Sequence, residues 1–181
     1  MTKRKPHILA IPGSPRKRSS NLSILKGIKE KYASEAGFDI FEGLGELPHF
    51  NPDMDNENLP TAVKSFREKI EAADGVLFCS PEYVFSLPGS LKNALDWLVS
   101  TTIFSGKPTA FIIAAASGKK AFESLDLILT TIEAKLAGSS KLLIPGAGGK
   151  VNNEGVLEDE MAVENIDLLV RSLLKSIEES S

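Results

Sequence analysis

The chain has 181 residues, of which 42% are hydrophobic and 25% are charged, so we expect residues 1–181 to form a single globular domain. A formal net charge of -3 disfavours a broad nucleic-acid or membrane-binding surface, and a lone cysteine, Cys79, excludes disulfide frameworks, cysteine-ligated iron–sulfur clusters and cysteine-rich zinc sites within one chain. No apolar run approaches the roughly 20 residues of a membrane span, and the run after the basic N-terminus is too short for a signal peptide, so we expect a cytoplasmic protein that binds no nucleic acid.

Short apolar runs alternate along the chain with segments whose apolar residues recur every three or four positions. Residues 7–11, 38–42, 75–79, 108–116 and 141–144 are predicted strands, and residues 22–36, 63–73, 91–98, 122–136 and 166–177 are predicted helices. Continuously apolar strands are typical of a parallel sheet that helices cover on both faces. The alternation therefore predicts an α/β fold, a three-layer doubly wound five-stranded parallel sheet with the flavodoxin-like strand order 2-1-3-4-5.

Two irregular segments leave the predicted second and fifth strands. Residues 43–58 are rich in Gly, Pro, Asn and Asp, and residues 145–155 contain four glycines. Ligands of such sheets bind at the carboxyl ends of the strands, where both segments begin. An ordinary surface loop accounts for either segment equally well.

The segment after the first strand, residues 13–21, predicts an anion site. Free backbone N–H groups and the helix dipole favour negative charge at the start of the helix that follows. Short polar and basic side chains at the same place suit a terminal phosphate, and the predicted contacts are Ser14, Arg16, Ser19, Ser20 and Asn21. Helix capping by Ser20 or Asn21 is the alternative, and the two roles are compatible.

The segment after the third strand, residues 80–89, predicts a platform for a planar ring. Pro81 and Pro88 stiffen it, and Tyr83 and Phe85 offer aromatic surface. Exposed backbone groups in a rigid loop can bind the polar edge of a flat heterocycle. Two apolar residues that follow, Leu91 and Trp97, are expected in the core.

Together these segments resemble the NADPH-dependent FMN reductases, a family that includes chromate and quinone reductases and related azoreductases. The resemblance rests on Gly13-Ser14-x-Arg16-x-x-Ser19-x-Asn21, on Pro81-Glu82-Tyr83 and on Ser86-x-Pro88-Gly89-x-Leu91-Lys92-Asn93-Ala94-x-Asp96-Trp97. It extends from the first strand to roughly the fifth. It implies a flavodoxin-like fold, noncovalent FMN, NADPH or NADH as electron donor, and a homodimer or homotetramer.

The resemblance also implies roles for individual residues. The phosphate would be held by the first-loop residues, and the isoalloxazine ring would be lined by Pro81, Glu82, Tyr83 and the adjacent Val84, with Ser117 and Gly118 at its pyrimidine side. The chain departs from the family where Val84 replaces a frequent Asn and where Lys119-Lys120 replaces a Gly-Gly pair. The two lysines are expected to narrow the ring's slot or to place positive charge beside it.

The function implied is an NAD(P)H oxidoreductase. A hydride would pass from NAD(P)H by way of FMN N5 to a small acceptor, such as a quinone, flavin, azo compound or metal oxyanion, in a ping-pong cycle. We name no catalytic side chain, because the cofactor supplies the chemistry, and no metal site, because His7 and His49 are far apart. We expect Cys79 to be an inert core thiol. Two alternatives stay open: a flavodoxin-like electron-transfer module that acts through a protein partner, and a flavin-free structural member of the family, suggested by Lys119-Lys120.

Overall fold

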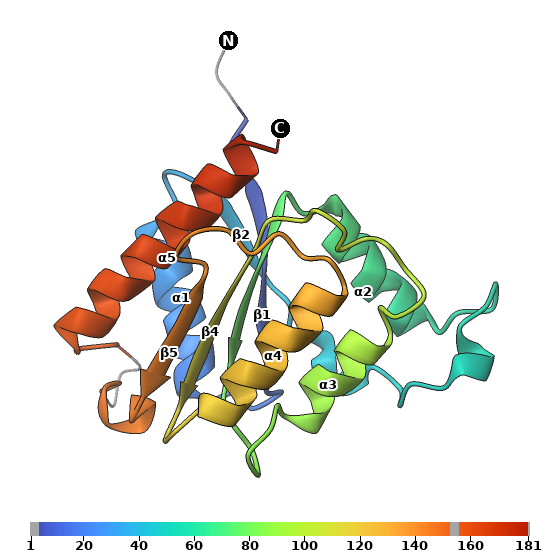
Figure 1. Ribbon diagram of the computed structural model, residues 1–181, viewed down its shortest axis with the longest axis horizontal. Coiled ribbons are helices and arrows are strands. Elements are labelled where there is room, and N and C mark those ends of the chain that lie inside the picture. Colours follow the sequence, from blue (N-terminus) through green and yellow to red (C-terminus); the bar gives the residue numbers. More distant parts are fainter. Residues whose placement is uncertain (1–3, 153–155, 181) are drawn as a thin grey trace.

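The computed structural model describes residues 4–152 and 156–180, and its centre is a parallel sheet of order β2-β1-β3-β4-β5 (Figure 1). The strands are β1 (His7–Pro12), β2 (Gly37–Ile40), β3 (Gly75–Ser80), β4 (Thr109–Ala115) and β5 (Lys141–Pro145). All four pairings are parallel, with Ala10 opposite Leu77 at the centre of the sheet. The predicted fold class and strand order are confirmed. Of the predicted irregular segment 145–155, residues 153–155 lie outside the described residues.

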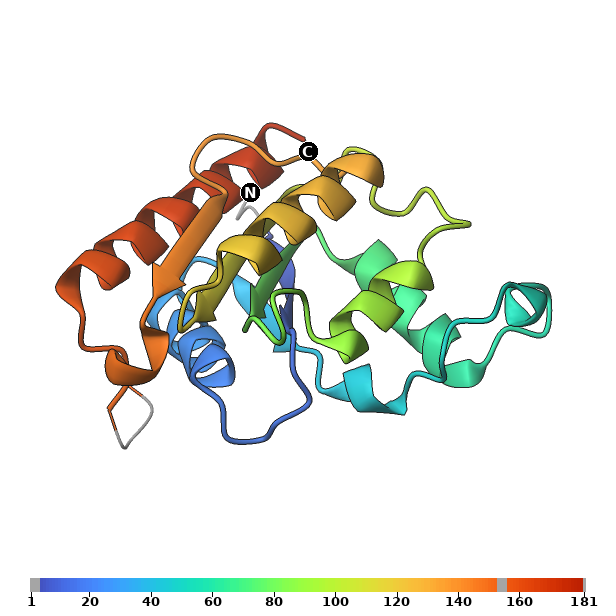
Figure 2. The ribbon, with the colours of Figure 1, turned by 60° about the horizontal axis from the view of Figure 1, so that its bottom comes forward.

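Helices cover both faces of the sheet and complete three layers (Figures 1 and 2). One face carries α1 (Ser20–Lys31) and α5 (Glu160–Glu178), and the other carries α2 (Thr61–Ala72), α3 (Gly89–Asp96) and α4 (Lys119–Thr131). Alternate residues of each strand point to opposite faces, so Ile8 packs toward α1 and α5 whereas Leu9 packs toward α2. The three inner strands are therefore buried along nearly their whole length and are mostly apolar, as the sequence pattern predicts.

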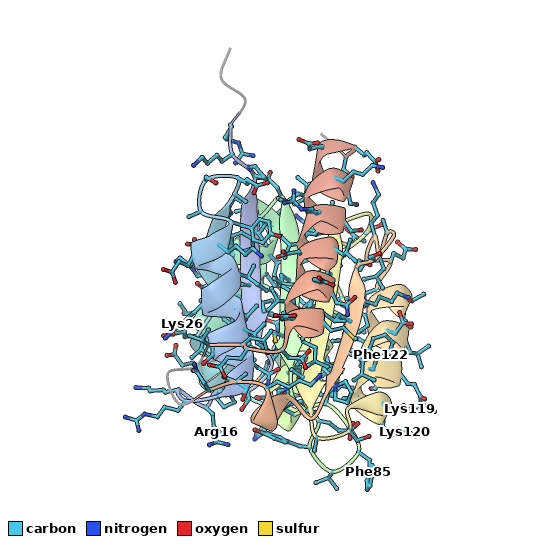
Figure 3. The ribbon with its side chains drawn as sticks, turned by 90° about the vertical axis from the view of Figure 1, so that its left-hand side faces the viewer. Arg16, Lys26, Phe85, Lys119, Lys120 and Phe122 are labelled. Carbon is cyan, nitrogen blue, oxygen red and sulfur yellow. The ribbon has the colours of Figure 1, made fainter. Side chains whose placement is uncertain are left out.

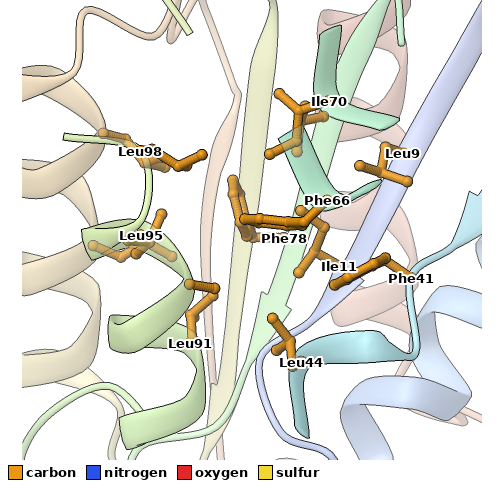
Figure 4. Close-up of a cluster of buried hydrophobic side chains, with 14 of the residues drawn as sticks. Leu9, Ile11, Phe41, Leu44, Phe66, Ile70, Phe78, Leu91, Leu95 and Leu98 are labelled. Atoms are coloured by element: carbon orange, nitrogen blue, oxygen red, sulfur yellow. The ribbon is translucent and has the colours of Figure 1, made fainter. Parts of the chain in front are cut away.

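The core on the α2 and α3 side is built from aromatic and branched side chains (Figure 4). Phe78 of β3 lies between Phe66 of α2 and Leu95 of α3, and all three are buried. Leu91 and Trp97 are fully buried, as predicted. The indole Nε1 of Trp97 donates a hydrogen bond of 2.8 Å to the carbonyl of Pro48, which satisfies its one polar atom.

The helix predicted over residues 122–136 is shifted toward the N-terminus, because α4 begins at Lys119 and ends at Thr131. The chain turns at Glu133, whose φ is +61°. Lys135 then runs beside the start of β4, where its N–H donates to the carbonyl of Lys107. Ala134 and Leu136 are therefore apolar because they pack against the core from an extended segment, and their spacing only resembles that of a helix.

The segment of residues 43–58 projects from the side of the sheet (Figure 2) but is tied down at two places. Asn93 of α3 accepts a hydrogen bond from the N–H of Phe50 at 2.7 Å and donates one to the carbonyl of Pro48 at 3.0 Å. Arg67 of α2 makes an ion pair of 2.9 Å with Asp55. The segment contains only two short 3-10 turns, so these side-chain contacts hold it in place of regular structure.

Candidate functional site

The end of β1 is pressed closely against the end of β3. A Cβ atom on Gly13 would lie 2.2 Å from the Oγ of Ser80, which no side chain could tolerate. The N–H of Gly13 donates to the carbonyl of Cys79 at 2.8 Å. A glycine at this position therefore lets the first loop start directly beside Ser80, where the second loop begins.

A cleft of about 460 Å³ opens at this carboxyl edge of the sheet, and its size suits a small-molecule ligand. Its walls are the loop before α1, the start of the loop after β3, and the segments that end β4 and follow β5. The lining residues are Arg16, Arg18, Ser19, Ser20, Asn21, Pro81, Tyr83, 114–116 and 146–149. The cleft thus joins the predicted anion loop to the predicted ring platform.

Ser19, and not Ser20 or Asn21, caps α1. Its Oγ accepts a hydrogen bond of 3.2 Å from the N–H of Leu22, and its backbone is extended. The capping roles expected of Ser20 and Asn21 are therefore wrong, because α1 already begins at Ser20 and both residues lie inside the helix. Ser19, Ser20 and Asn21 line the cleft, so the N-terminus of α1, where the helix dipole favours negative charge, lies at the cleft.

Asn21 fastens three elements together at the floor of the cleft. Its amide nitrogen donates to the carbonyl of Ala114 at 3.2 Å, and its amide oxygen accepts from the Cys79 thiol at 3.2 Å. Burial raises the pKa of the Cys79 thiol well above its ordinary value, so the sulfur stays protonated and unreactive. Cys79 is therefore a core thiol, as expected.

Ser14 supports the second loop from below. Its side chain is only 3% exposed and its hydroxyl lies 3.2 Å from the hydroxyl of Tyr83, a residue that lines the cleft. The backbone N–H of Arg16 also points to the Ser14 hydroxyl, at 3.4 Å. Ser14 therefore links the two loops and is not itself among the lining residues.

The second loop contains a strained hairpin turn. Tyr83 and Ser86 exchange two backbone hydrogen bonds of 2.9 and 3.0 Å, which leaves Val84 and Phe85 at the tip with φ values of 50° and 55°. Their side chains are 95% and 78% exposed, and Figure 3 shows Phe85 projecting at the edge of the molecule. Positive φ is a genuine outlier for a β-branched residue such as Val84.

Glu82 does not line the cleft, although the resemblance implied that it would. Its carboxylate instead accepts hydrogen bonds from the N–H groups of Gly118, Lys120 and Ala121, at 3.2, 2.9 and 3.0 Å. Glu82 therefore caps α4 from a distant part of the sequence.

The two lysines at the start of α4 lie outside the cleft lining. Lys120 makes an ion pair of 2.7 Å with Glu123, one turn along the helix. Figure 3 shows Lys119 and Lys120 on the side of this edge opposite Arg16. That the two lysines narrow the ring's slot or place positive charge beside it stays a prediction.

Six of the predicted site residues therefore meet in one cleft, and five lie beside it. Arg16, Ser19, Ser20, Asn21, Pro81 and Tyr83 are lining residues, whereas Ser14, Glu82, Val84, Ser117 and Gly118 are not. Residues 114–116 and 146–149 also line the cleft and were not predicted to do so. The run of small residues that ends β4 and the glycines that follow β5 were the available signals, because both stand at the carboxyl ends of strands.

The chemistry of the cleft fits a phosphate joined to a flat ring. Arg16 and Arg18 bring two guanidinium groups to the mouth, and α1 presents its N-terminus. On the opposite wall, Gly146, Gly148 and Gly149 have open space where a Cβ would stand, so a ligand can approach their backbone. FMN combines a phosphate with a planar ring, and the residues present suit both parts.

Residues 4–152 and 156–180 lack two features. In these ranges no three His, Cys, Asp or Glu side chains are grouped so that they could hold a metal ion. In the same ranges no helix is both long enough and apolar enough to cross a membrane.

A parallel sheet of this order, with a phosphate-suited loop after β1 and an aromatic loop after β3, defines a flavodoxin-like protein. A solved structure has a similar fold. The flavoenzyme FerB, an NAD(P)H:(acceptor) oxidoreductase from Paracoccus denitrificans, superposes with a TM-score of 0.82 at 26% identity, covering 96% of this chain and 98% of the other.

Sequence comparison assigns the family. A family described as NADPH-dependent FMN reductase matches residues 6–149. A quinone reductase of Pseudomonas putida is 33% identical over 84% of this chain and 85% of its own, and an NAD(P)H-dependent FMN reductase of Pseudomonas aeruginosa is 33% identical over 92% of each. The chain belongs to the NADPH-dependent FMN reductase family. It is an oxidoreductase whose cofactor is FMN and whose electron donor is NAD(P)H.

Proposed function

We propose that the cleft between Arg16, Tyr83 and residues 146–149 binds FMN. With FMN bound, the protein would use NAD(P)H to reduce a small acceptor in a ping-pong cycle. The observation that carries the proposal is the union of a basic, helix-terminal loop with an aromatic loop in one cleft of small-molecule size. A quinone is the acceptor that we favour, because relatives named quinone reductases match most of the chain. An NADPH azoreductase of a Bacillus species, 35% identical over 76% of this chain, adds azo compounds to the acceptors worth testing.

The proposal gives separate tasks to the residues of the two loops. Arg16, Ser19, Ser20 and the first-turn N–H groups of α1 would bind the phosphate, while Pro81 and Tyr83 would bound the ring. Ser14 would hold the Tyr83 hydroxyl, and Asn21 would fix the start of α1 to β4. Bound FMN would supply the hydride-transfer chemistry, so no protein acid or base is assigned.

The first test is an FMN titration followed by flavin fluorescence. We expect saturable binding of one FMN per chain. Arg16→Ala should weaken binding by about tenfold, because a hydrogen bond to a charged group contributes roughly 1.5–3 kcal/mol in favourable cases and Arg16 is exposed. Lys26→Ala is the matched control. It also removes one positive charge, and Lys26, in α1, does not line this cleft (Figure 3). An Arg16→Ala affinity equal to that of the control would contradict the phosphate assignment.

Steady-state kinetics separate the proposal from the electron-transfer module. NADPH oxidation with a quinone alone, with parallel double-reciprocal lines, is the expected result for a ping-pong reductase. Oxidation that requires a protein partner would favour the module instead. The flavin-free alternative loses the observation that suggested it, because Lys119 and Lys120 lie outside the cleft lining.

We also retain two predictions about organisation: that residues 1–181 form one domain, and that the chain assembles as a homodimer or homotetramer. Light scattering on the purified protein measures the second directly. A mass equal to that of one chain, 19.5 kDa, would contradict it.

A further inference from the structure

We propose that Glu82 is a positioning residue. It holds the loop after β3 and the loop between β4 and α4 at a fixed separation beside the FMN cleft, and this inference rests on the proposed function. Glu82 stands between Pro81 and Tyr83, both of which line the cleft. Its carboxylate is bound across the edge of the sheet to the first turn of α4. Ala115 and Ala116, which precede Ser117 and Gly118 at the start of α4, line the same cleft.

Three hydrogen bonds make the connection. The Oε1 atom accepts from the N–H of Gly118 at 3.2 Å, and the Oε2 atom accepts from the N–H groups of Lys120 and Ala121 at 2.9 and 3.0 Å. An ionised carboxylate can accept all of these bonds at once. Bonds to an ionised acceptor at a helix N-terminus are stronger than bonds between neutral groups.

The start of α4 lacks a cap of its own. Gly118 occupies the N-cap position with a φ of +88° and has no side chain that could accept a hydrogen bond. Any other residue would be strained there, since its Cβ atom would lie 2.7 Å from the Leu143 side chain and its backbone would have a disfavoured positive φ. The acceptor must therefore come from another segment, and Glu82 supplies it.

The link acts through the backbone of α4 and not through its basic side chains. The ammonium of Lys120 is paired with Glu123, at 2.7 Å, and both groups are exposed. Removing the Glu82 carboxylate would therefore free three N–H groups and leave the helix surface unchanged. With the link gone, the loops on the two sides of the cleft could move apart.

The experiment compares the native chain with Glu82→Ala, Glu82→Gln and the control Glu123→Ala. Gln has one oxygen in place of two and can keep only part of the cap. Two readouts are taken: hydrogen exchange of the Lys120 and Ala121 amides in FMN-free protein, and FMN affinity by fluorescence. We expect Glu82→Ala to exchange these amides at least tenfold faster and to bind FMN about tenfold more weakly. Glu82→Gln should be intermediate in both readouts, and Glu123→Ala should match the native chain.

Two results would overturn the proposal. Native-like FMN affinity in Glu82→Ala would show that the link does not set the cleft. Weaker FMN binding with unchanged exchange would show that Glu82 acts on the cofactor directly. If Glu82→Ala does not fold, the same two criteria are applied to Glu82→Gln. A native chain that binds no FMN would contradict the proposed function, and the exchange readout would still show whether the link exists.

Discussion

Val84 and Phe85 hold a backbone conformation that their side chains disfavour. Both have positive φ, and the two hydrogen bonds between Tyr83 and Ser86 close the turn around them. Such a turn ordinarily prefers Asn or Gly at these positions. The strain is maintained because both ends of the turn are fixed: Ser14 is beside the Tyr83 hydroxyl and Leu87 is buried.

Replacing Val84 with Asn should therefore stabilise the protein. Asn adopts positive φ at lower cost, and relief of about 1 kcal/mol corresponds to a rise in Tm of roughly 2–4 °C for a chain of this size. Val99→Asn is the matched control, because Val99 is also exposed but has no positive φ. Thermal unfolding of the two variants measures the difference, and equal Tm values would show that the turn stores no strain.

The bonding partners of the Glu82 and Asn21 side chains could not be predicted from the sequence. Both belong to motifs that suggested cofactor contact, yet their side chains bond to protein atoms 36 to 93 positions away. A cap supplied from another segment leaves no local signature, because the helix start and its acceptor are not neighbours in sequence. Arg16 and Tyr83 could be predicted as lining residues, since their places after β1 and β3 follow from the strand order alone.

The helix α3 shows that a motif can have a structural role. Of the residues that resemble the family there, Asn93 and Trp97 bind the segment of residues 43–58 and lie outside the FMN cleft. That segment was predicted as irregular, and it is. The sequence could not show that it is held by side chains of α3.

Asn93→Ala should release this segment. The change leaves the N–H of Phe50 and the carbonyl of Pro48 without their side-chain partner, which costs about 1–3 kcal/mol where such groups are buried. We expect faster hydrogen exchange at Phe50 and earlier proteolytic cleavage within residues 43–58. Lys92→Ala, which removes an exposed i,i+4 ion pair with Asp96 in the same helix, should have little effect. Similar cleavage rates in the two variants would refute the role of Asn93.

The ends of helices were harder to predict than the strands. Apolar residues at 132, 134 and 136 continue the spacing of α4, but the helix stops at Thr131 because the chain has to return to the edge of β4. The spacing of apolar residues indicates which positions are buried. An extended segment that packs on a core can show the same spacing as a helix. The five strands were clearer, since a buried parallel strand has few alternative patterns.

One ion-paired group ties α1 to α5 and makes the assembled fold sensitive to acid. Asp167 of α5 accepts hydrogen bonds from Lys31 at 2.5 Å and from the Tyr32 hydroxyl at 2.9 Å. Burial alone would raise the pKa of Asp167, but the bonds from Lys31 and Tyr32 outweigh it and hold the pKa below 3.8. Burial and the same carboxylate raise the pKa of Tyr32 to about 12.

A lowered carboxyl pKa stabilises the folded state above pH 3.8, and the contribution is lost as the pH falls through the folded-state value. Asp167→Asn should therefore lower the free energy of unfolding by about 1 kcal/mol at pH 7, the range of partly exposed ion pairs. The difference from the native chain should disappear as the pH falls through the lowered pKa of Asp167. Urea unfolding across this pH range measures it. Glu164→Gln, which changes an exposed carboxylate of α5, is the control, and a difference for Asp167→Asn that persists at low pH would contradict the assignment.

The position of α5 in the chain has a consequence for synthesis on the ribosome. Every segment that lines the cleft is made before α5, yet α5 covers the sheet face that contains Leu77, Ala110 and Ile112. At about 5–20 residues per second, the 19 residues of α5 take roughly one to four seconds to add. Until α5 has been added and has packed, this face of the sheet is uncovered, and the nascent chain exposes an apolar surface that can aggregate.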